Sequence, residues 1–249
     1  MIFTVSDSAP IRLGDGDVGV VLSHGFTGTP GSVRPWAEAI AAHPGTRVIA
    51  PRLTGHGTRW QDMERVNWRD WVIDIQAAYA ELKPHCRVIF AGGLSMGGAL
   101  ALRLAQTREV VGVLLVNPGV ASGDKLLNMA GALRHVVKSQ PGIASDIAKE
   151  GVTEPAYDIV SVRAAWQMTK LWAAVRKDLS LVQVPTLLMH SARDHVVDDA
   201  SRKILEAALP QMEKVLLPNS FHVATLDHDQ ELVGGQSVEF IDRVVAPQV

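Results

Sequence analysis

The chain has 249 residues, 47% of them hydrophobic, and a formal net charge of −2 from 24 Lys and Arg against 26 Asp and Glu. This balance argues against a nucleic-acid-binding protein, which is usually basic with a clustered patch. The single cysteine, Cys86, excludes an internal disulfide and a cysteine-rich zinc site. The N-terminus lacks a cationic start followed by an apolar stretch, and no apolar run approaches the roughly 20 residues of a membrane helix, which predicts a soluble, cytoplasmic protein.

Short β-branched runs alternate along the chain with longer amphipathic segments. Strands are predicted over residues 18–22, 48–50, 87–91, 110–116, 186–189 and 214–217, and helices over 32–42, 68–82, 96–106, 199–209 and 230–245. Strands that alternate with helices pair in parallel and carry helices on both faces. Continuous Val, Ile and Leu runs are typical of strands that are buried on both sides. The fold class is therefore predicted as α/β, with a mostly parallel central sheet flanked by helices.

Residues 118–180 interrupt this alternation, because they contain only helical pattern. Leu126, Ala130, Leu133 and Val137 share one helical stripe. The expected organisation is a core of residues 1–117 and 181–249 with a helical insertion at 118–180, which is either a packing appendage or a cap over an active site. Six residues give this segment more apolar surface than one buried stripe needs: Leu126, Leu127, Met129, Leu133, Val136 and Val137. They are expected either to pack on the sheet or to face a lipid aggregate.

The segment Gly-Leu-Ser-Met-Gly at residues 93–97 matches the G-x-S-x-G pattern. In this pattern the serine sits on a sharp turn between a strand and a helix, and the glycines let backbone segments pass closely. The predicted strand 87–91 and helix 96–106 supply that context. A glycine-rich phosphate-binding turn is the alternative, but the lysine of a P-loop and the glycine spacing of a dinucleotide site are missing. Ser95 is therefore predicted to be a nucleophile.

A serine hydroxyl needs a base, and the base needs a carboxylate that orients it. With this motif the expected chain order is serine, acid, histidine. Histidines after Ser95 are His135, inside the insertion, and His190, His195, His222 and His228 beyond it. His222 follows the last predicted strand by a short loop, where a base at the sheet edge is expected. His190 ends a strand, His195 is a loop residue and His228 adjoins the last helix, so His222 is the predicted base.

Three aspartates compete for the role of the acid: Asp194, Asp198 and Asp199. The last two directly precede a predicted helix, where capping and first-turn roles explain them. Asp194 lies in the loop just past strand 186–189 and is the predicted acid. The negative charge that develops on an attacked carbonyl oxygen also needs preorganised donors. The predicted donors are the backbone N–H of Met96, after the nucleophile, and that of Phe26, in the loop after the first strand.

Six segments together resemble the bacterial monoacylglycerol lipases, which are small α/β-hydrolases with a short helical cap. They are HGFTGTP (24–30), PRLTGHGT (51–58), DMER (62–65), GLSMGG (93–98), DHVV (194–197) and HVATLD (222–227), and the similarity runs from Val20 to Asp229. The resemblance implies an α/β-hydrolase fold, a Ser95–Asp194–His222 triad and an oxyanion hole from the N–H groups of Phe26 and Met96. It also implies hydrolysis of monoacylglycerols to glycerol and fatty acid without a cofactor. A cap carboxylate in this family meets the glycerol hydroxyls, and Glu154 aligns with it.

Several alternatives stay open at this point. A general carboxylesterase acting on short soluble esters would use the same triad, and a peptidase, a thioesterase or a ligand-sensing binding protein would use the same scaffold. A halide or epoxide hydrolase is disfavoured because it would need an aspartate at position 95. The expected partner is a small lipid ester, with transient contact to a membrane or micelle through the cap, and both monomer and dimer are open. No metal is expected, since no ligand spacing such as HExxH occurs.

Overall fold

A seven-stranded sheet forms the centre of the computed structural model, which describes residues 4–124, 127, 129–142, 145–209 and 211–246. The strands are β1 (Ile11–Gly14), β2 (Val18–Ser23), β3 (Thr46–Ala50), β4 (Val88–Leu94), β5 (Gly112–Val116), β8 (Thr186–Ser191) and β9 (Met212–Leu217). Their order is β1-β3-β2-β4-β5-β8-β9, and all neighbours pair in parallel except β1, which runs antiparallel to β3. The predicted mostly parallel sheet is confirmed. β1 escaped prediction because four residues give too short a pattern.

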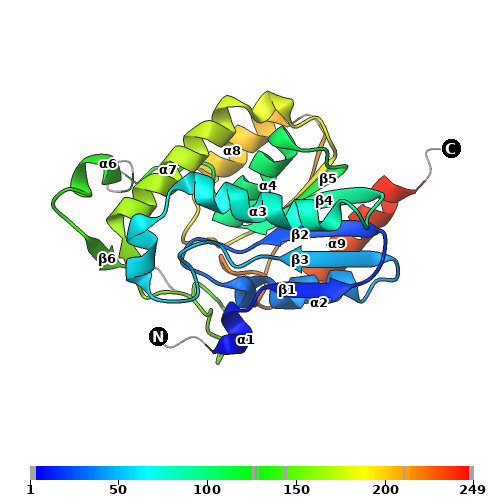
Figure 1. The fold of residues 1–249 in the computed structure, drawn as a ribbon, viewed down its shortest axis with the longest axis horizontal. Coiled ribbons are helices and arrows are strands. Elements are labelled where there is room, and N and C mark those ends of the chain that lie inside the picture. The colour runs from blue at the N-terminus through cyan, green and yellow to red at the C-terminus, as the bar shows by residue number, and fades with distance from the viewer. Residues whose placement is uncertain (1–3, 125–126, 128, 143–144, 210, 247–249) are drawn as a thin grey trace.

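Helices cover both faces of the sheet, as the alternation predicted (Figure 1). One face carries α3 (Trp68–Leu82), α4 (Met96–Thr107), α7 (Val162–Lys177) and α8 (Asp199–Ala208), and the other carries α2 (Arg34–Ala41) and α9 (Gln230–Val245). The connecting segments contain a short α-helix, α1 (Val5–Ser8), and the short 3-10 helices η1 (Pro30–Val33), η2 (Trp60–Arg65) and η3 (Leu179–Leu181). None of the described helices is long and apolar enough to cross a membrane.

Alternation of side chains along each strand divides the core into two layers. In β2, Val21 packs under α3 and α4, whereas Val20 and Leu22 pack against the layer of α2 and α9. Successive residues of a strand point to opposite faces, so an all-apolar strand supplies both layers at once. In β4 the same alternation separates Ile89 from Phe90, whose ring meets Phe240 of α9 edge-on. Both layers are therefore anchored on the strands that end at the candidate site.

The insertion between β5 and β8 departs from the helix-only prediction. It contains two short antiparallel strands, β6 (Ser139–Pro141) and β7 (Ile159–Ser161), and its helix α6 (Ala130–Leu133) is a single turn. The prediction was wrong because Pro141 has no N–H to continue a helix and the β-branched pair Ile159-Val160 favours an extended chain. In Figure 1, α6 and β6 lie at one end of the molecule, beyond the end of the sheet.

The predicted apolar stripe of the insertion is divided in the structure. Leu126 lies outside the described residues. Leu127 packs against the core, and Leu133 is half-buried. The side chains of Met129, Val136 and Val137 are 54%, 79% and 39% exposed. Because α6 ends at Leu133, Val137 does not continue a helical face. Three apolar side chains of the insertion therefore face outward.

Candidate active site

Ser95 occupies a strained turn between β4 and α4. Its backbone angles are φ 55° and ψ −120°, a conformation that L residues rarely adopt and that is typical of a nucleophile on a sharp strand-to-helix turn. Its N–H donates to the Val116 carbonyl at 3.0 Å, and its own carbonyl accepts from Gly98 and Gly119 at 2.9 and 3.1 Å. A Cβ added to Gly97 would lie 2.2 Å from the Ser23 carbonyl oxygen. Position 97 therefore has to be glycine for β2 and α4 to pass this closely.

His222 and Asp194 form a hydrogen-bonded pair, although they lie 28 residues apart in the chain. His222 Nδ1 is 2.8 Å from Asp194 Oδ2, and the two side chains are 8% and 10% exposed. Asp194 Oδ1 accepts from the N–H groups of Val196 and Val197, both at 2.8 Å. Burial works to raise the pKa of Asp194, but the hydrogen bonds from His222 and from these two amides hold it below its ordinary value. A carboxylate that stays ionised fixes the imidazole with Nε2 free to exchange a proton.

Asn117 links the base to the end of the sheet. It directly follows β5 with φ 43°, is 3% exposed, and its Nδ2 donates to the His222 carbonyl at 2.8 Å. The same amide group bridges to Ser191 at the end of β8, where Oδ1 accepts from the Ser191 N–H at 2.8 Å. Asn117 was not among the residues predicted from the sequence. The signal available was a polar residue directly after a buried strand, which is where functional side chains gather in parallel sheets.

The loop after β2 lies against the nucleophile. A Cβ added to Gly25 would be 3.4 Å from Ser95 Cβ and 3.9 Å from its Oγ. His24 holds the loop with both ring nitrogens: Nδ1 donates to the Gly25 carbonyl at 2.9 Å, and Nε2 accepts from the Leu53 N–H at 3.2 Å. Burial lowers the pKa of His24 to about 4, so this ring is neutral at pH 7. The loop is thus fixed by a neutral, fully buried imidazole.

Aromatic rings support the predicted oxyanion donors from behind. The Phe26 ring meets His56 and Trp71 edge-on, with centroids 6.3 and 6.1 Å apart, and His56 meets His24 at 5.0 Å. These contacts hold the Phe26 backbone next to the strained turn of Ser95. Met96 begins α4, and the first amides of a helix have no acceptor within the helix. The two predicted donor residues therefore belong to separate segments: Met96 directly follows Ser95, and Phe26 lines the same cavity as Ser95.

A cavity of about 210 Å³ joins these groups. Its wall contains Ser95 and His222 together with Gly25, Phe26 and Thr27 of the loop after β2. The insertion supplies another part of the lining, with apolar residues that include Leu127, Val160, Ala165, Met168 and Trp172. The space next to the serine is therefore enclosed jointly by the sheet and the insertion.

Glu154 of the insertion lines the same cavity and is only 7% exposed. One of its carboxylate oxygens, Oε1, lies 2.9 Å from the point where a Cβ on Gly28 would sit, and the Ser32 side chain hydrogen-bonds to the carboxylate. Burial raises the pKa of Glu154, and this outweighs the lowering by Ser32 and by the charge of His222. An acidic group is thus held at the polar end of a largely apolar cavity.

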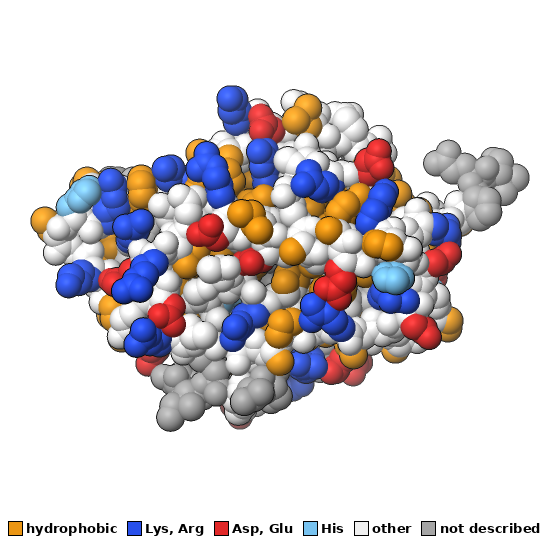
Figure 2. Space-filling view, in the orientation of Figure 1, with side chains coloured by type: hydrophobic (Ala, Val, Ile, Leu, Met, Phe, Trp, Pro, Cys, Tyr) orange, Lys and Arg blue, Asp and Glu red, His pale blue; other side chains and the backbone are white. Residues whose placement is uncertain are grey.

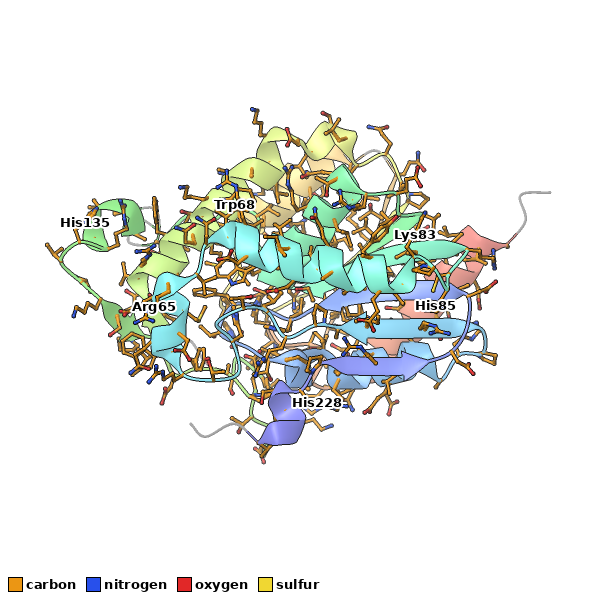
Figure 3. All side chains as sticks on the ribbon, in the orientation of Figure 1. Arg65, Trp68, Lys83, His85, His135 and His228 are labelled. Carbon is orange, nitrogen blue, oxygen red and sulfur yellow. The ribbon has the colours of Figure 1, made fainter. Side chains whose placement is uncertain are left out.

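The other candidates lie elsewhere. His190 lines a second cavity, of about 200 Å³, which does not contain Ser95. Asp198 caps α8 by accepting from the Ala200 N–H at 2.9 Å, and Asp199 pairs with Arg202 in the first turn. Figure 3 places His135 at the outer end of the insertion and His228 at the lower margin of the molecule, near α1 in this view. Among the described residues, no three His, Cys, Asp or Glu side chains come together in a way that could hold a metal ion.

Comparison with known proteins agrees with this fold. The model of the alpha/beta hydrolase family matches residues 20–234. A thermostable monoacylglycerol lipase from Bacillus sp. (strain H-257) is 40% identical over 247 residues, 96% of this chain and 96% of that protein. A carboxylesterase from Bacillus subtilis (strain 168) is 26% identical over 240 residues, 94% of this chain and 96% of that protein.

A solved structure from work on the metagenome-derived lipolytic enzymes LipS and LipT is 36% identical. It superimposes with a TM-score of 0.91 over 95% of this chain and 98% of that one. Fold, family model and relatives agree over nearly the whole length. The chain belongs to the alpha/beta hydrolase family, and within it to the group that includes the bacterial monoacylglycerol lipases.

Proposed function

We propose that this protein hydrolyses monoacylglycerols to glycerol and a free fatty acid through an acyl-enzyme on Ser95. The observation that carries the proposal is that His222, which is hydrogen-bonded to Asp194, lines the same cavity as Ser95. The substrate class follows from the relative of 40% identity, which is a monoacylglycerol lipase. An apolar wall with one buried carboxylate suits a molecule that has a hydrocarbon chain at one end and hydroxyls at the other.

In the first half-reaction, Ser95 Oγ attacks the ester carbonyl while His222 Nε2 takes the hydroxyl proton. Asp194 keeps the imidazole in the tautomer with hydrogen on Nδ1 and stabilises the imidazolium that forms. The oxygen of the tetrahedral intermediate carries a negative charge, which the N–H groups of Phe26 and Met96 accommodate. His222 then returns its proton to the glycerol oxygen, the C–O bond breaks, and glycerol leaves. Ser95 remains as its fatty acyl ester.

In the second half-reaction, water occupies the place of glycerol. His222 removes a proton from this water as its oxygen attacks the acyl carbon, and the same two amides stabilise the second oxyanion. Breakdown of the intermediate returns the proton to Ser95 Oγ and releases the fatty acid. Only protein groups and water take part in this sequence.

Recognition of the two ends of the substrate is assigned to different parts of the cavity. The acyl chain lies along the apolar wall that the insertion provides, where its burial releases ordered water. The glycerol hydroxyls donate to Glu154, because a carboxylate accepts from two hydroxyls through charge-assisted bonds. A general carboxylesterase of short soluble esters is the second candidate, favoured by the relative of 26% identity.

Contact with a lipid surface is part of the proposal. Met129, Val136 and Val137 are exposed apolar side chains on the insertion, and Arg134 and Lys138 lie in the same segment. Figure 2 shows hydrophobic and basic side chains together over the end of the molecule where the insertion lies. Such a surface suits a peripheral, reversible contact with an aggregate that presents the substrate.

A substrate panel tests the proposed function. Purified protein should hydrolyse monoacylglycerols faster than diacylglycerols, as measured by release of free fatty acid. Ser95→Ala should lower kcat by several orders of magnitude because the nucleophile and base act as a unit. A rate for short p-nitrophenyl esters far above that for every monoacylglycerol would instead establish the general carboxylesterase. Near-normal turnover by Ser95→Ala would refute the mechanism.

Asp194→Asn should lower kcat by about 10⁴-fold, because an amide cannot hold His222 in the required tautomer or stabilise its charged form. Asp198→Asn is the matched control, since it removes the same charge four residues away and asparagine is also a good helix cap. Steady-state hydrolysis of one soluble ester by both variants distinguishes them. If the Asp198 variant were the impaired one, the assignment of the acid would be wrong.

Glu154→Ala should lower kcat/KM for monoacylglycerols. The expected loss of transition-state stabilisation is about 1–3 kcal/mol, the typical value of a hydrogen bond to a charged group. Hydrolysis of p-nitrophenyl esters, which carry no glycerol, should stay close to that of the original protein. Equal losses on both substrates would show that Glu154 does not recognise glycerol.

Glu154→Gln removes the ionisable group of this residue and keeps its size, so it tests how the carboxyl changes stability with pH. Burial raises the folded-state pKa of Glu154, so the unfolded chain loses this proton at a lower pH than the folded protein does. The carboxyl therefore stabilises the fold below the unfolded pKa, and this contribution is lost as the pH rises towards the folded pKa. The free energy of unfolding of Glu154→Gln, measured relative to the original protein in urea, should increase across that interval and level off above it.

Val136→Glu should weaken binding to phospholipid vesicles and slow hydrolysis of emulsified monoacylglycerols, because the charge must enter the lipid interface. Soluble esters should be hydrolysed at an unchanged rate. Ile73→Glu is the control, since Ile73 is 60% exposed but lies on α3, outside the insertion. Vesicle co-sedimentation separates the two variants, and equal weakening in both would remove the assignment of the surface.

A further inference from the structure

The backbone of His222 is held from two sides, and only one side belongs to the sheet. Its carbonyl accepts from Asn117 at the end of β5, as described above. Its N–H donates to Asp146 Oδ2 at 3.0 Å, and Asp146 belongs to the insertion. The next amide, that of Val223, donates to the Asp146 backbone carbonyl at 3.1 Å. The insertion therefore hydrogen-bonds to the loop of the base at two successive residues, His222 and Val223.

The same carboxylate also holds the loop of the acid. Asp146 Oδ2 accepts from the His195 N–H at 3.2 Å, and Asp146 Oδ1 lies 2.8 Å from His195 Nδ1. His195 directly follows Asp194. One side chain, 13% exposed, thus joins the residue after the acid to the base itself. The His195 ring also packs edge-on against Phe221, the residue before His222, with centroids 4.6 Å apart.

We infer that Asp146 is a positioning residue, which fixes the loops of Asp194 and His222 relative to one another and so sets the geometry of the triad. This inference rests on the proposed function, because it assigns a role within that triad. His195 is part of the same arrangement. Its ring hydrogen-bonds to the Asp146 carboxylate and packs against Phe221, the residue before His222. A misplacement of about 1 Å at a reacting group can cost about 10²-fold in rate.

Other hydrogen bonds keep the insertion docked on the core when the Asp146 side chain is removed. A second carboxylate, Asp227, holds the neighbouring part of the insertion to the core by accepting from Ala148 and Lys149 at 2.7 and 2.9 Å. It also accepts from Phe221 and is fully buried. Removing the Asp146 side chain leaves these bonds and the backbone bond to Val223 in place. The segment should therefore stay docked while the side-chain link between the two loops is lost.

Asp146→Ala should lower kcat for a soluble p-nitrophenyl ester by about ten- to a hundredfold, with KM changed less than twofold. Labelling of Ser95 by a fluorophosphonate should slow by a similar factor, because this reaction also depends on the base. Asp146→Asn should recover most of the lost kcat, since its amide oxygen can accept from both backbone N–H groups. Glu150→Ala, which removes an exposed carboxylate from the same insertion, is the matched control and should behave like the original protein.

A spectroscopic measurement separates positioning from a purely structural effect. The Nδ1 proton that His222 shares with Asp194 should give a strongly downfield proton NMR signal. That signal should shift or broaden in Asp146→Ala and stay in place in Glu150→Ala. If Asp146→Ala does not fold, the same measurements on His195→Gln decide, because this change removes the ring that pairs with Asp146. A shifted signal with a severalfold lower kcat at unchanged KM would then support the inference.

Two results would overturn the inference. One is an unchanged kcat and NMR signal in folded Asp146→Ala or, if that variant does not fold, in His195→Gln. The other is a kcat loss accompanied by an equal change in KM. Failure of the proposed function would look different, because the original protein itself would then neither turn over esters nor react with the fluorophosphonate.

Discussion

The strained backbone of Ser95 is the constraint on which the site depends. A positive φ at a non-glycine residue is unfavourable, and it persists only where the surroundings over-determine it. Here the Ser95 N–H and carbonyl are bound by Val116, Gly98 and Gly119, and Gly97 allows α4 to approach the end of β2. The same close approach brings Gly25 into contact with the serine. One strained turn thus fixes the nucleophile and the adjacent loop together.

Parallel strands explain why the remaining groups meet there. β2, β4, β5, β8 and β9 run in the same direction, so the loops at their carboxyl ends lie along one edge of the sheet. These loops carry the segment Gly25–Thr27, then Ser95, Asn117, Asp194 and His222, in that order across the sheet. Ligands of open parallel sheets bind at this edge for the same topological reason.

The buried histidines of this site differ in their neighbours. His24 is fully buried without a carboxylate, its pKa falls to about 4, and it serves as a neutral support for the loop after β2. His56 behaves in the same way, since burial and then the charge of His24 lower its pKa. His222 is almost as buried but faces Asp194, which remains ionised through its hydrogen bonds. The carboxylate neighbour therefore distinguishes His222 from His24 and His56, since it fixes the orientation of the His222 ring through Nδ1.

The sequence by itself determined the sheet and its flanking helices. It also predicted Ser95, Asp194 and His222 as a triad, and in the structure the last two are hydrogen-bonded and Ser95 and His222 line one cavity. Helices 68–82 and 230–245 have the predicted bounds. The capping box of Asn67 and Asp70 defines the start of the first helix within four residues of sequence. The motif around Ser95 and the positions of Asp194 and His222 after predicted strands are equally local. The insertion gave no such signal: β6 and β7 pair residues that lie 18 to 22 positions apart in the chain, and α6 ends at Leu133, before the last residue of the predicted stripe.

Only the tertiary structure revealed Asn117 and Asp146. Their partners are backbone groups of residues 105 and 76 positions away, which no short sequence pattern encodes. It also decided that Glu154 enters the cavity, which the sequence suggested only through resemblance. Contacts within one turn or strand join residues that are close in the sequence, so a short pattern can predict them. Contacts between loops join distant residues and form only when the sheet brings its strand ends together.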